Sequence, residues 1–185
     1  IDGISIVNPN EFDKIDDYVE EFYRLRQRKG ITKDTAYNTM LTSPNHFGAM
    51  MVRKGDACSM VSGLSYHYPE TIRLALQIIG KDPVYEVVSD MHIVSTKNNV
   101  YFLADTTVNL NPTPNQIADI TLQTADFVKY FDIEPIVALL SYSNFGSAKG
   151  DTPEKMHKAL QIIKQRNPEL IVDGEMQADT AVSTM

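Results

Sequence analysis

The sequence comprises 185 residues, and its content of 43% hydrophobic and 22% charged residues is typical of a globular protein and excludes disordered or collagen-like chains. The 17 Lys and Arg residues against 24 Asp and Glu give a formal net charge of −7, which argues against nucleic-acid and anionic-membrane partners. No apolar run approaches the roughly 18 residues of a membrane-spanning helix, and the single cysteine, Cys58, suits a reducing, cytoplasmic compartment. Because Ile1 already lies in an apolar segment and no tail precedes Met185, we expect a piece of a longer protein.

The first residues predict a short strand and then two helices. Residues 4–7 (ISIV) form a β-branched run that is typical of a buried strand. Apolar residues at helical spacing predict a helix over residues 12–25, with acids at its start, bases at its end and Gly30 just after it. Thr32 is a typical N-cap and predicts a second, short helix that ends near Leu41.

Two more helices and a second strand are expected next. Ser43 and Pro44 are typical of a helix start, and Gly55 is typical of a helix end. Residues 58–61 are predicted as a short strand. Pro69 begins a further helix, and its buried face is expected to comprise Ile72, Ala75, Leu76 and Ile79.

Four strands are predicted in the second half of the sequence. Residues 84–94 and 100–104 are β-rich and flank turn residues, which predicts a hairpin. Residues 136–140 (IVALL) and 170–172 are apolar runs of the kind found in parallel strands that are covered on both faces.

Helices are predicted between these strands. Thr113 and Thr152, each followed by proline, are typical N-caps of two helices. The positions expected to be buried in them are Ile117, Ile120, Val128, Phe131, Met156, Ala159, Leu160 and Ile163. The alternation of strands and helices predicts a three-layer α/β fold with a mixed, mostly parallel sheet. A boundary near residues 81–83 divides the chain into subdomains of residues 1–83 and 84–185.

Three polar loops that follow apolar strands are the candidate functional segments. Residues 141–150 (SYSNFGSAKG) offer hydroxyls, two glycines and a lysine, which can donate hydrogen bonds to an anion outside the carboxyl end of a strand. Residues 105–109 (DTTVN) and 173–179 (DGEMQAD) carry acids and amides that can position a ligand. Ordinary turn and capping chemistry is the alternative interpretation of all three loops.

Neither common catalytic signatures nor a metal site can be found. The motifs GxGxxG, GxxxxGK[ST], HExxH and GxSxG are absent, and the four histidines lack metal-ligand spacing. Two groups of cations have alternative roles. Arg24, Arg26, Arg28 and Lys29 either neutralise a helix C-terminus or bind phosphate. Arg73 either extends from an apolar helix to the surface or binds phosphate.

Six segments, in order, resemble the phosphate acetyl/butyryltransferase family almost from end to end. They are LRQRKGIT (25–32), FGAMMVRKGDACSMVSG (47–63), TIRLALQIIG (71–80), ADTTVNLNPTPNQIADI (104–120), IEPIVALLSYSNFGSAKG (133–150) and NPELIVDGEMQADTAV (167–182). The resemblance implies an isocitrate-dehydrogenase-like α/β/α fold with two subdomains, a coenzyme A cleft between them and a homo-oligomer, usually a dimer. Family members move an acetyl group between coenzyme A and phosphate.

The resemblance also implies which residues bind coenzyme A. Arg26 matches the arginine of the family's LRxxKG motif, and Arg73 matches that of its TLRP motif, whose proline is Leu74 here. The loop residues expected to line the same cleft are Ser141, Ser143, Asn144, Ser147 and Lys149. Cys58 and Ser59 stand where the family usually has Asp-Gly, and no catalytic residue is carried over.

A second kind of family member is fused behind a malic enzyme, where it senses acetyl-CoA without turning it over. SYSNFGS (141–147), with Asn144-Phe145 in place of a Thr-Lys pair, and DGEMQADTAV (173–182) resemble this kind. We therefore expect an acetyl-CoA-binding regulatory domain, inactive alone, in cis with an NADP-dependent malic enzyme. That parent would oxidise malate to pyruvate using NADP and a divalent metal in its own domain. The alternatives are a catalytic phosphate acetyltransferase and a piece that folds without binding a ligand.

Overall fold

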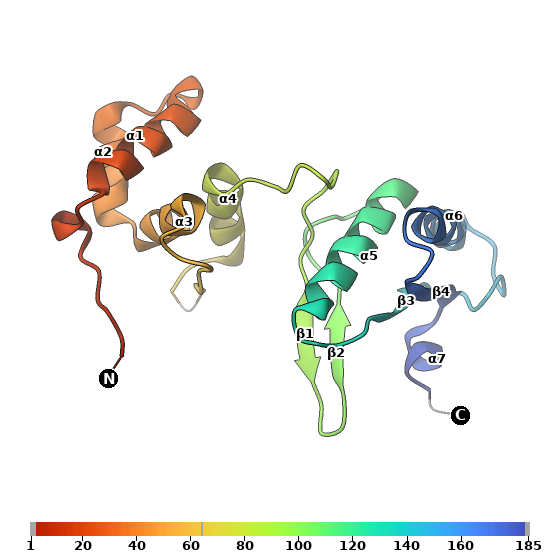
Figure 1. Ribbon diagram of the computed structural model, residues 1–185. Helices are drawn as coiled ribbons and strands as arrows, with labels where there is room; N and C mark the ends of the chain where they lie inside the picture. The colour runs from red at the N-terminus through yellow and green to blue at the C-terminus, as the bar shows by residue number, and fades with distance from the viewer. Residues whose placement is uncertain (1–2, 64, 184–185) are drawn as a thin grey trace. The chain divides into compact units, whose positions relative to one another are not determined.

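The computed structural model describes residues 3–63 and 65–183, and its internal contacts divide the chain into two units, residues 1–81 and 82–185. Figure 1 shows the first unit in red to yellow and the second in green to blue. Each unit has its own hydrophobic core. We describe the two units separately.

Helices make up the regular structure in the described part of the first unit. They are η1 (Pro9–Glu11), α1 (Ile15–Arg26), η2 (Gln27–Lys29), α2 (Lys33–Thr42), α3 (Pro44–Lys54) and α4 (Tyr68–Ile78). The Thr32 hydroxyl accepts a hydrogen bond from the Thr35 N–H at 3.1 Å, and Ser43 caps α3 in the same way. Gly55 ends α3 in the left-handed conformation, with φ of 78°. The predicted starts of α2 and α3 are therefore confirmed.

The core of the first unit differs from the prediction at α4. Tyr18, Met40 and Met50 are fully buried, and α4 contributes Leu74 and Ile78 to this core. The expected face is wrong, because Leu76 and Ile79 are 44% and 42% exposed. Apolar residues surround most of this helix, so the spacing could not decide which part of the wide apolar stripe meets the core.

Two strands predicted in the first unit are not formed. Residues 4–7 and 58–61 are irregular, and Ile6 and Val61 are 95% and 98% exposed. A strand needs a neighbour to satisfy its backbone N–H and C=O groups. The described residues of this unit contain no strand with which either segment could pair.

The second unit begins with an antiparallel hairpin. Strands β1 (His92–Ser95) and β2 (Val100–Leu103) pair with His92 opposite Leu103, which confirms the hairpin. The predicted first strand is shorter than expected, because residues 84–91 are irregular. Their backbone bonds instead to helix side chains: the Glu86 N–H donates to Asp119 at 2.6 Å, and the Gln123 amide donates to the Val87 carbonyl at 3.0 Å.

A helix and strand alternation completes the second unit. It consists of α5 (Pro114–Lys129), β3 (Ile136–Leu140), α6 (Asp151–Arg166), β4 (Ile171–Met176) and α7 (Ala178–Val182). The capping box between Thr113 and Gln116 is formed as predicted. Two details are corrected: Gly150, not Thr152, is the N-cap of α6, and Phe131 is 47% exposed because it lies beyond the end of α5.

The strands β3 and β4 are parallel, and their two faces are covered differently. Leu139 and Val172 pack with α5 and α6 in the core of the unit. Ile136 and Ala138 lie outside this core and line a pocket with Ala181 of α7, which the core residue Val172 also borders. Figure 1 shows α7 on the side of the strands away from α6. The alternation of α5, β3, α6 and β4 confirms the α/β class, although the described residues form two sheets of two strands each.

Strand β4 extends further than predicted, to Met176. Residues 173–176, expected to begin a loop, continue the strand and pair with β3 across an irregularity after Leu139. Gly174 sits at this irregularity with φ of 135°, and a Cβ there would lie 2.6 Å from the Leu139 carbonyl oxygen. Only glycine allows the two backbones to approach so closely.

Candidate functional site

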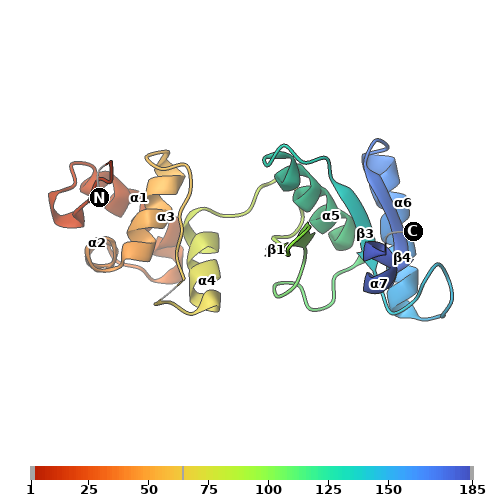
Figure 2. The same cartoon turned by 90° about the horizontal axis from the view of Figure 1, so that it is seen from below.

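The serine loop, residues 141–150, connects β3 to α6 and is attached to β4 along its length. The Ser141 N–H donates to the Met176 carbonyl at 2.9 Å, and the Phe145 N–H donates to the Glu175 carbonyl at 2.9 Å. The first bond extends the pairing of β3 with β4 by one residue, and the second attaches the middle of the loop to β4. Figure 2 shows β3, β4 and α6 side by side around this connection.

A buried carboxylate forms the centre of the serine loop. Glu175 is 5% exposed, and its Oε1 accepts hydrogen bonds from the Gly146 N–H at 2.7 Å and the Ser143 hydroxyl at 3.1 Å. Ser143 is fully buried and also accepts from the Ala148 N–H at 3.1 Å. Donation from Gly146, helped by Ser143, lowers the pKa of the Glu175 carboxyl although burial opposes this. The carboxylate is therefore an internal anion.

An amide pair fixes the outer part of the same loop. The Gln177 N–H donates to Asn144 Oδ1 at 2.7 Å, and Asn144 Nδ2 returns a bond to Gln177 Oε1 at 2.9 Å. Gln177 also donates to the Tyr142 carbonyl at 2.8 Å. The Asn144 N–H donates to the Ser147 hydroxyl at 2.9 Å. Asn144 therefore serves first to join the loop to the segment after β4.

These contacts change what the serine loop can offer to an anion. Its backbone N–H groups at Phe145, Gly146 and Ala148 all have acceptors inside the unit. Ser147 and Lys149 remain exposed at the surface of the loop. An approaching phosphate would therefore meet mainly side chains, with the Lys149 ammonium as the cation of the loop.

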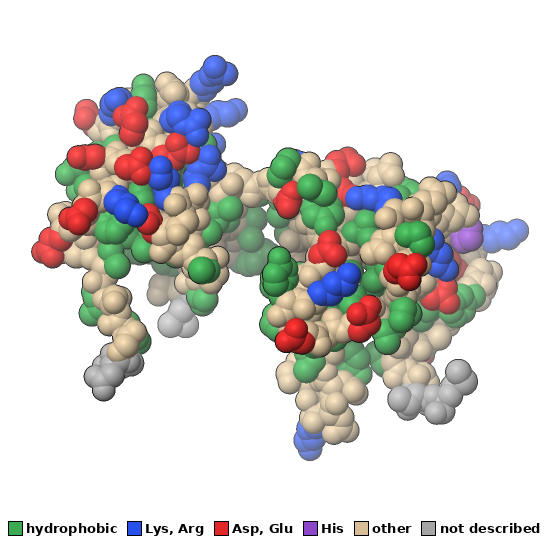
Figure 3. All heavy atoms as spheres, in the orientation of Figure 1, with side chains coloured by type: hydrophobic (Ala, Val, Ile, Leu, Met, Phe, Trp, Pro, Cys, Tyr) green, Lys and Arg blue, Asp and Glu red, His purple; other side chains and the backbone are tan. Residues whose placement is uncertain are grey.

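The two predicted arginines lie in the first unit. Arg26 is half-buried at the end of α1, and Arg73 is exposed on α4. Arg24, two residues before Arg26 on α1, is held by Glu21 through two hydrogen bonds of 2.7 and 2.8 Å. Figure 3 shows the Lys and Arg side chains of this unit interspersed with Asp and Glu. Arg24 is thus committed to an acid on its own helix.

The loop of residues 105–109 uses its acid for turn chemistry. Asp105 accepts hydrogen bonds from the N–H groups of Val108 at 2.9 Å and Asn109 at 3.1 Å. Asp90 accepts from the Thr106 N–H at 2.8 Å, and its oxygen lies 3.2 Å from Nδ1 of His92. Burial acts to raise the pKa of Asp90, but a hydrogen bond shared with the Asp105 carboxyl group and hydrogen bonds from Thr106 and Thr107 outweigh it and lower the pKa.

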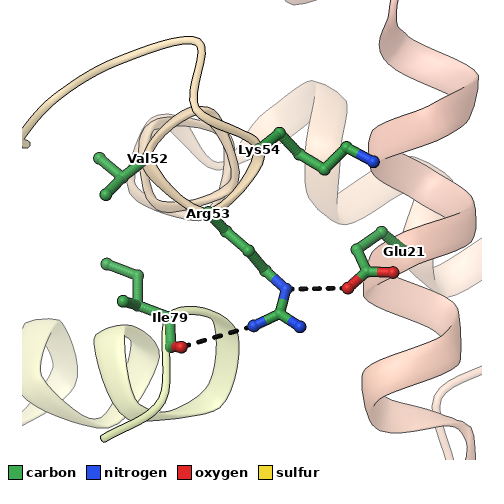
Figure 4. A pocket seen from close by; sticks show the side chains of 5 residues that line it. All are labelled: Glu21, Val52, Arg53, Lys54 and Ile79. Carbon is green, nitrogen blue, oxygen red and sulfur yellow. Dashed lines mark hydrogen bonds and ion pairs between the residues drawn. The ribbon is translucent and has the colours of Figure 1, made fainter. Parts of the chain in front are cut away.

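A pocket in the first unit was not expected from the sequence. It has a volume of about 590 Å³ and is lined by Glu21, Val52, Arg53, Lys54 and Ile79 (Figure 4). Arg53 donates to Glu21 at 2.8 Å and to the Ile78 carbonyl at 2.7 Å, so it joins α1 to the end of α4. Lys54 pairs with Asp17 at 2.8 Å. Acids of the same unit therefore neutralise both cations of this pocket.

Sequence reasoning missed Glu175 and Gln177 as residues that shape the site. Both lay in a segment noted for its polar content, but the pairing that brings them to the serine loop spans 32 and 33 positions. In the described part of the chain, no group of three or more His, Cys, Asp or Glu residues could hold a metal ion. Of the helices that the described residues form, none is long and apolar enough to span a membrane.

The sequence is similar to two kinds of curated protein. The phosphate acetyltransferase of Nitratidesulfovibrio vulgaris is 40% identical over 182 residues, which cover 98% of this chain and 26% of that protein. The phosphate acetyltransferase of Bacillus subtilis is 38% identical, with 97% and 55% covered. The NADP-dependent malic enzyme of Escherichia coli is 36% identical, with 96% and 23% covered. The chain thus spans about a quarter to just over half the length of these relatives.

The fold is similar to solved structures of one of these kinds. A EutD phosphotransacetylase from Staphylococcus aureus matches with a TM-score of 0.85 and 32% identity, over 98% of this chain and 56% of that one. A phosphotransacetylase from Streptococcus pyogenes matches with a TM-score of 0.83 and 38% identity, over 95% and 54% of the two chains. The phosphate acetyl/butaryl transferase family matches residues 1–185. The chain therefore belongs to the phosphate acetyl/butaryl transferase family.

Proposed function

We propose that the chain is part of a phosphotransacetylase-type domain that binds acetyl-CoA and regulates an NADP-dependent malic enzyme in cis. In the first unit, Arg26 and Arg73 would bind the coenzyme's phosphates. In the second, Ser141, Asn144, Ser147 and Lys149 would contact it, while Ser143 would support the loop from its buried position. NADP and the divalent metal would belong to the malic enzyme domain. The protein would act in the cytoplasm as a homo-oligomer.

The observation that carries the regulatory role is the pair Asn144-Phe145. By resemblance, catalytic members have a Thr-Lys pair here, whereas this loop has an amide bonded to Gln177 and an exposed aromatic ring. At residues 144–145 the loop thereby lacks the cation that, by resemblance, catalytic members carry there. Binding without turnover suits a sensor. Regulation then requires that acetyl-CoA bind one conformation of the parent more tightly than another.

A catalytic phosphate acetyltransferase is the second candidate, and the identities favour it. The phosphate acetyltransferases of N. vulgaris and B. subtilis are 40% and 38% identical, against 36% for the malic enzyme of E. coli. In this role, the coenzyme thiolate would attack the carbonyl carbon of acetyl phosphate and release phosphate. Arginines and the serine loop would bind the phosphate.

Two assays on the full-length protein separate the candidates. Formation of acetyl phosphate and coenzyme A from acetyl-CoA and phosphate is expected to be absent, and acetyl-CoA is expected to change the rate of malate oxidation. Robust acetyl phosphate formation would overturn the regulatory role in favour of the catalytic one. If acetyl-CoA bound but neither formed acetyl phosphate nor changed the rate of malate oxidation, the regulatory proposal would fail.

Replacement of the two arginines tests the coenzyme contacts. Arg26→Ala and Arg73→Ala should each weaken acetyl-CoA binding by about 1–3 kcal/mol, because each would remove a charge-assisted hydrogen bond to phosphate. Isothermal titration of the full-length variants measures the effect. Arg24→Ala is the matched control on the same helix, and we expect it to bind like the unchanged protein because Glu21 already holds this arginine. Unchanged affinity in both test variants would remove these arginines from the site.

A further inference from the structure

The buried hydrogen bonds of the serine loop converge on the Glu175 carboxylate, to which neither proposed function assigns a role. Oε1 of Glu175 accepts from the Gly146 N–H at 2.7 Å and from the Ser143 hydroxyl at 3.1 Å. The backbone carbonyl of the same residue accepts from the Phe145 N–H at 2.9 Å. Through this one residue of β4, the strand therefore contacts three residues of the loop, Ser143, Phe145 and Gly146.

The loop has little else to order its interior. Ser143 is fully buried, and its hydroxyl links the carboxylate to the Ala148 N–H at 3.1 Å and to the Ser147 hydroxyl at 3.4 Å. Phe145 points its ring to solvent, with 60% of its surface exposed, so it provides no core contact. Hydrogen bonds to an ionised acceptor are stronger than bonds between neutral groups. The shape of the loop thus depends on a buried negative charge more than on apolar packing.

We propose that Glu175 is the positioning residue of the serine loop: its carboxylate acts as an internal anion around which residues 143–148 fold, and this presents Ser147 and Lys149 to a phosphate-bearing ligand. The ligand part of this inference rests on the proposed acetyl-CoA binding. The positioning part does not, because it concerns contacts inside the unit. Glu175 itself would not touch the ligand, since it is 5% exposed.

Three variants of the full-length protein separate positioning from general stability. Glu175→Ala removes the internal anion, and Glu175→Gln keeps an oxygen that can accept from Gly146 without the charge. Asp119→Ala is the matched control: Asp119 is 4% exposed and accepts from Arg166 and the Glu86 N–H, away from the loop. Amide hydrogen exchange at residues 145–148 and acetyl-CoA affinity by isothermal titration are the two measurements.

We expect Glu175→Ala to lose exchange protection at residues 145–148 and to weaken acetyl-CoA binding about ten- to hundredfold. Glu175→Gln should restore part of both, and Asp119→Ala should keep loop protection and bind within about twofold of the unchanged protein although it is destabilised. If Glu175→Ala retained both protection and affinity, the proposal would be overturned. If Glu175→Ala did not fold, the same result with Glu175→Gln would overturn it. If the unchanged protein did not bind acetyl-CoA, the proposed function would fail. Loop exchange would then still decide the positioning role: lost protection in the variant supports it, and retained protection refutes it.

Discussion

The two units of the chain differ in where they place charge. In the first, ion pairs such as Lys33 with Glu20 at 2.7 Å and Lys54 with Asp17 at 2.8 Å join helices at the surface. In the second, two carboxylates are buried, because Asp119 and Glu175 are only 4% and 5% exposed. Among the described residues, the other buried polar ones are Asn45 in the first unit and Thr121 and Ser143 in the second.

This difference shows how the two units hold their irregular segments. Buried acceptors in the second unit bind backbone N–H groups that have no ladder partner: Asp119 binds that of Glu86, and Glu175 binds that of Gly146. The first unit instead joins helices that satisfy their own backbones, and its core is filled by Tyr18, Met40 and Met50. A buried acceptor specifies the shape of a loop, whereas apolar packing specifies how helices meet.

The largest expected effect is the loss of a buried acceptor. Asp119→Ala should destabilise the second unit by about 3–5 kcal/mol, because Arg166 loses its partner at 2.6 Å and the Glu86 N–H loses its acceptor. Urea denaturation measures the change. Glu154→Ala is the control, since it removes an exposed acid that pairs with Lys158 at 3.9 Å. Equal effects of the two changes would show that burial of charge does not distinguish the second unit.

A smaller effect is expected from a methyl group at the strand irregularity. Gly174→Ala should cost about 2–4 kcal/mol, because φ is 135° and the new Cβ would lie 2.6 Å from the Leu139 carbonyl oxygen. Gly30→Ala is the matched control in the first unit: φ is 89°, but nothing lies within 4 Å of the added Cβ. It should cost about 1 kcal/mol. Thermal unfolding of both variants tests the contrast, which a cost at Gly174 no greater than at Gly30 would refute.

Lowering the pH tests the ion pairs that Glu21 forms with Arg24 and Arg53 in the first unit. A hydrogen bond from Arg24, opposed by burial and aided by Arg53, lowers the pKa of Glu21 from 4.5 to about 2. Because the pKa of Glu21 is lower in the folded state, its ionised carboxylate stabilises the unit above pH 4.5. This contribution is lost as pH falls from 4.5 toward 2. Glu21→Gln should therefore cost about 1 kcal/mol at pH 7 and progressively less below pH 4.5. Urea denaturation across this pH range measures the difference, and a cost that stays constant with pH would contradict the assignment.

The sequence predicted the local features of the fold better than the non-local ones. Thr32, Ser43 and the Thr113–Gln116 box start helices as expected, because a cap acts within three residues of its own position. Residues 4–7 and 58–61 have strand composition, but a strand forms only where a partner lies beside it. Composition carries no information about that partner.

In the candidate site, too, the sequence predicted the local features better than the non-local ones. The serine loop was identified from its position after an apolar strand and from its hydroxyls. Its organisation by Glu175 and Gln177 was not predicted, because the register of β3 against β4 places these side chains beside it from more than 30 positions away. The assignment of Asn144 as a ligand contact could not foresee that its amide already bonds to Gln177.

Acetyl-CoA binding is tested most directly by isothermal titration of the full-length protein, with Lys149→Ala as the companion variant. Lys149 is the exposed cation of the serine loop. We predict saturable binding by the unchanged protein and affinity reduced about tenfold in the variant, since a phosphate would lose one charged contact. The absence of any binding heat with millimolar acetyl-CoA would contradict the proposed function.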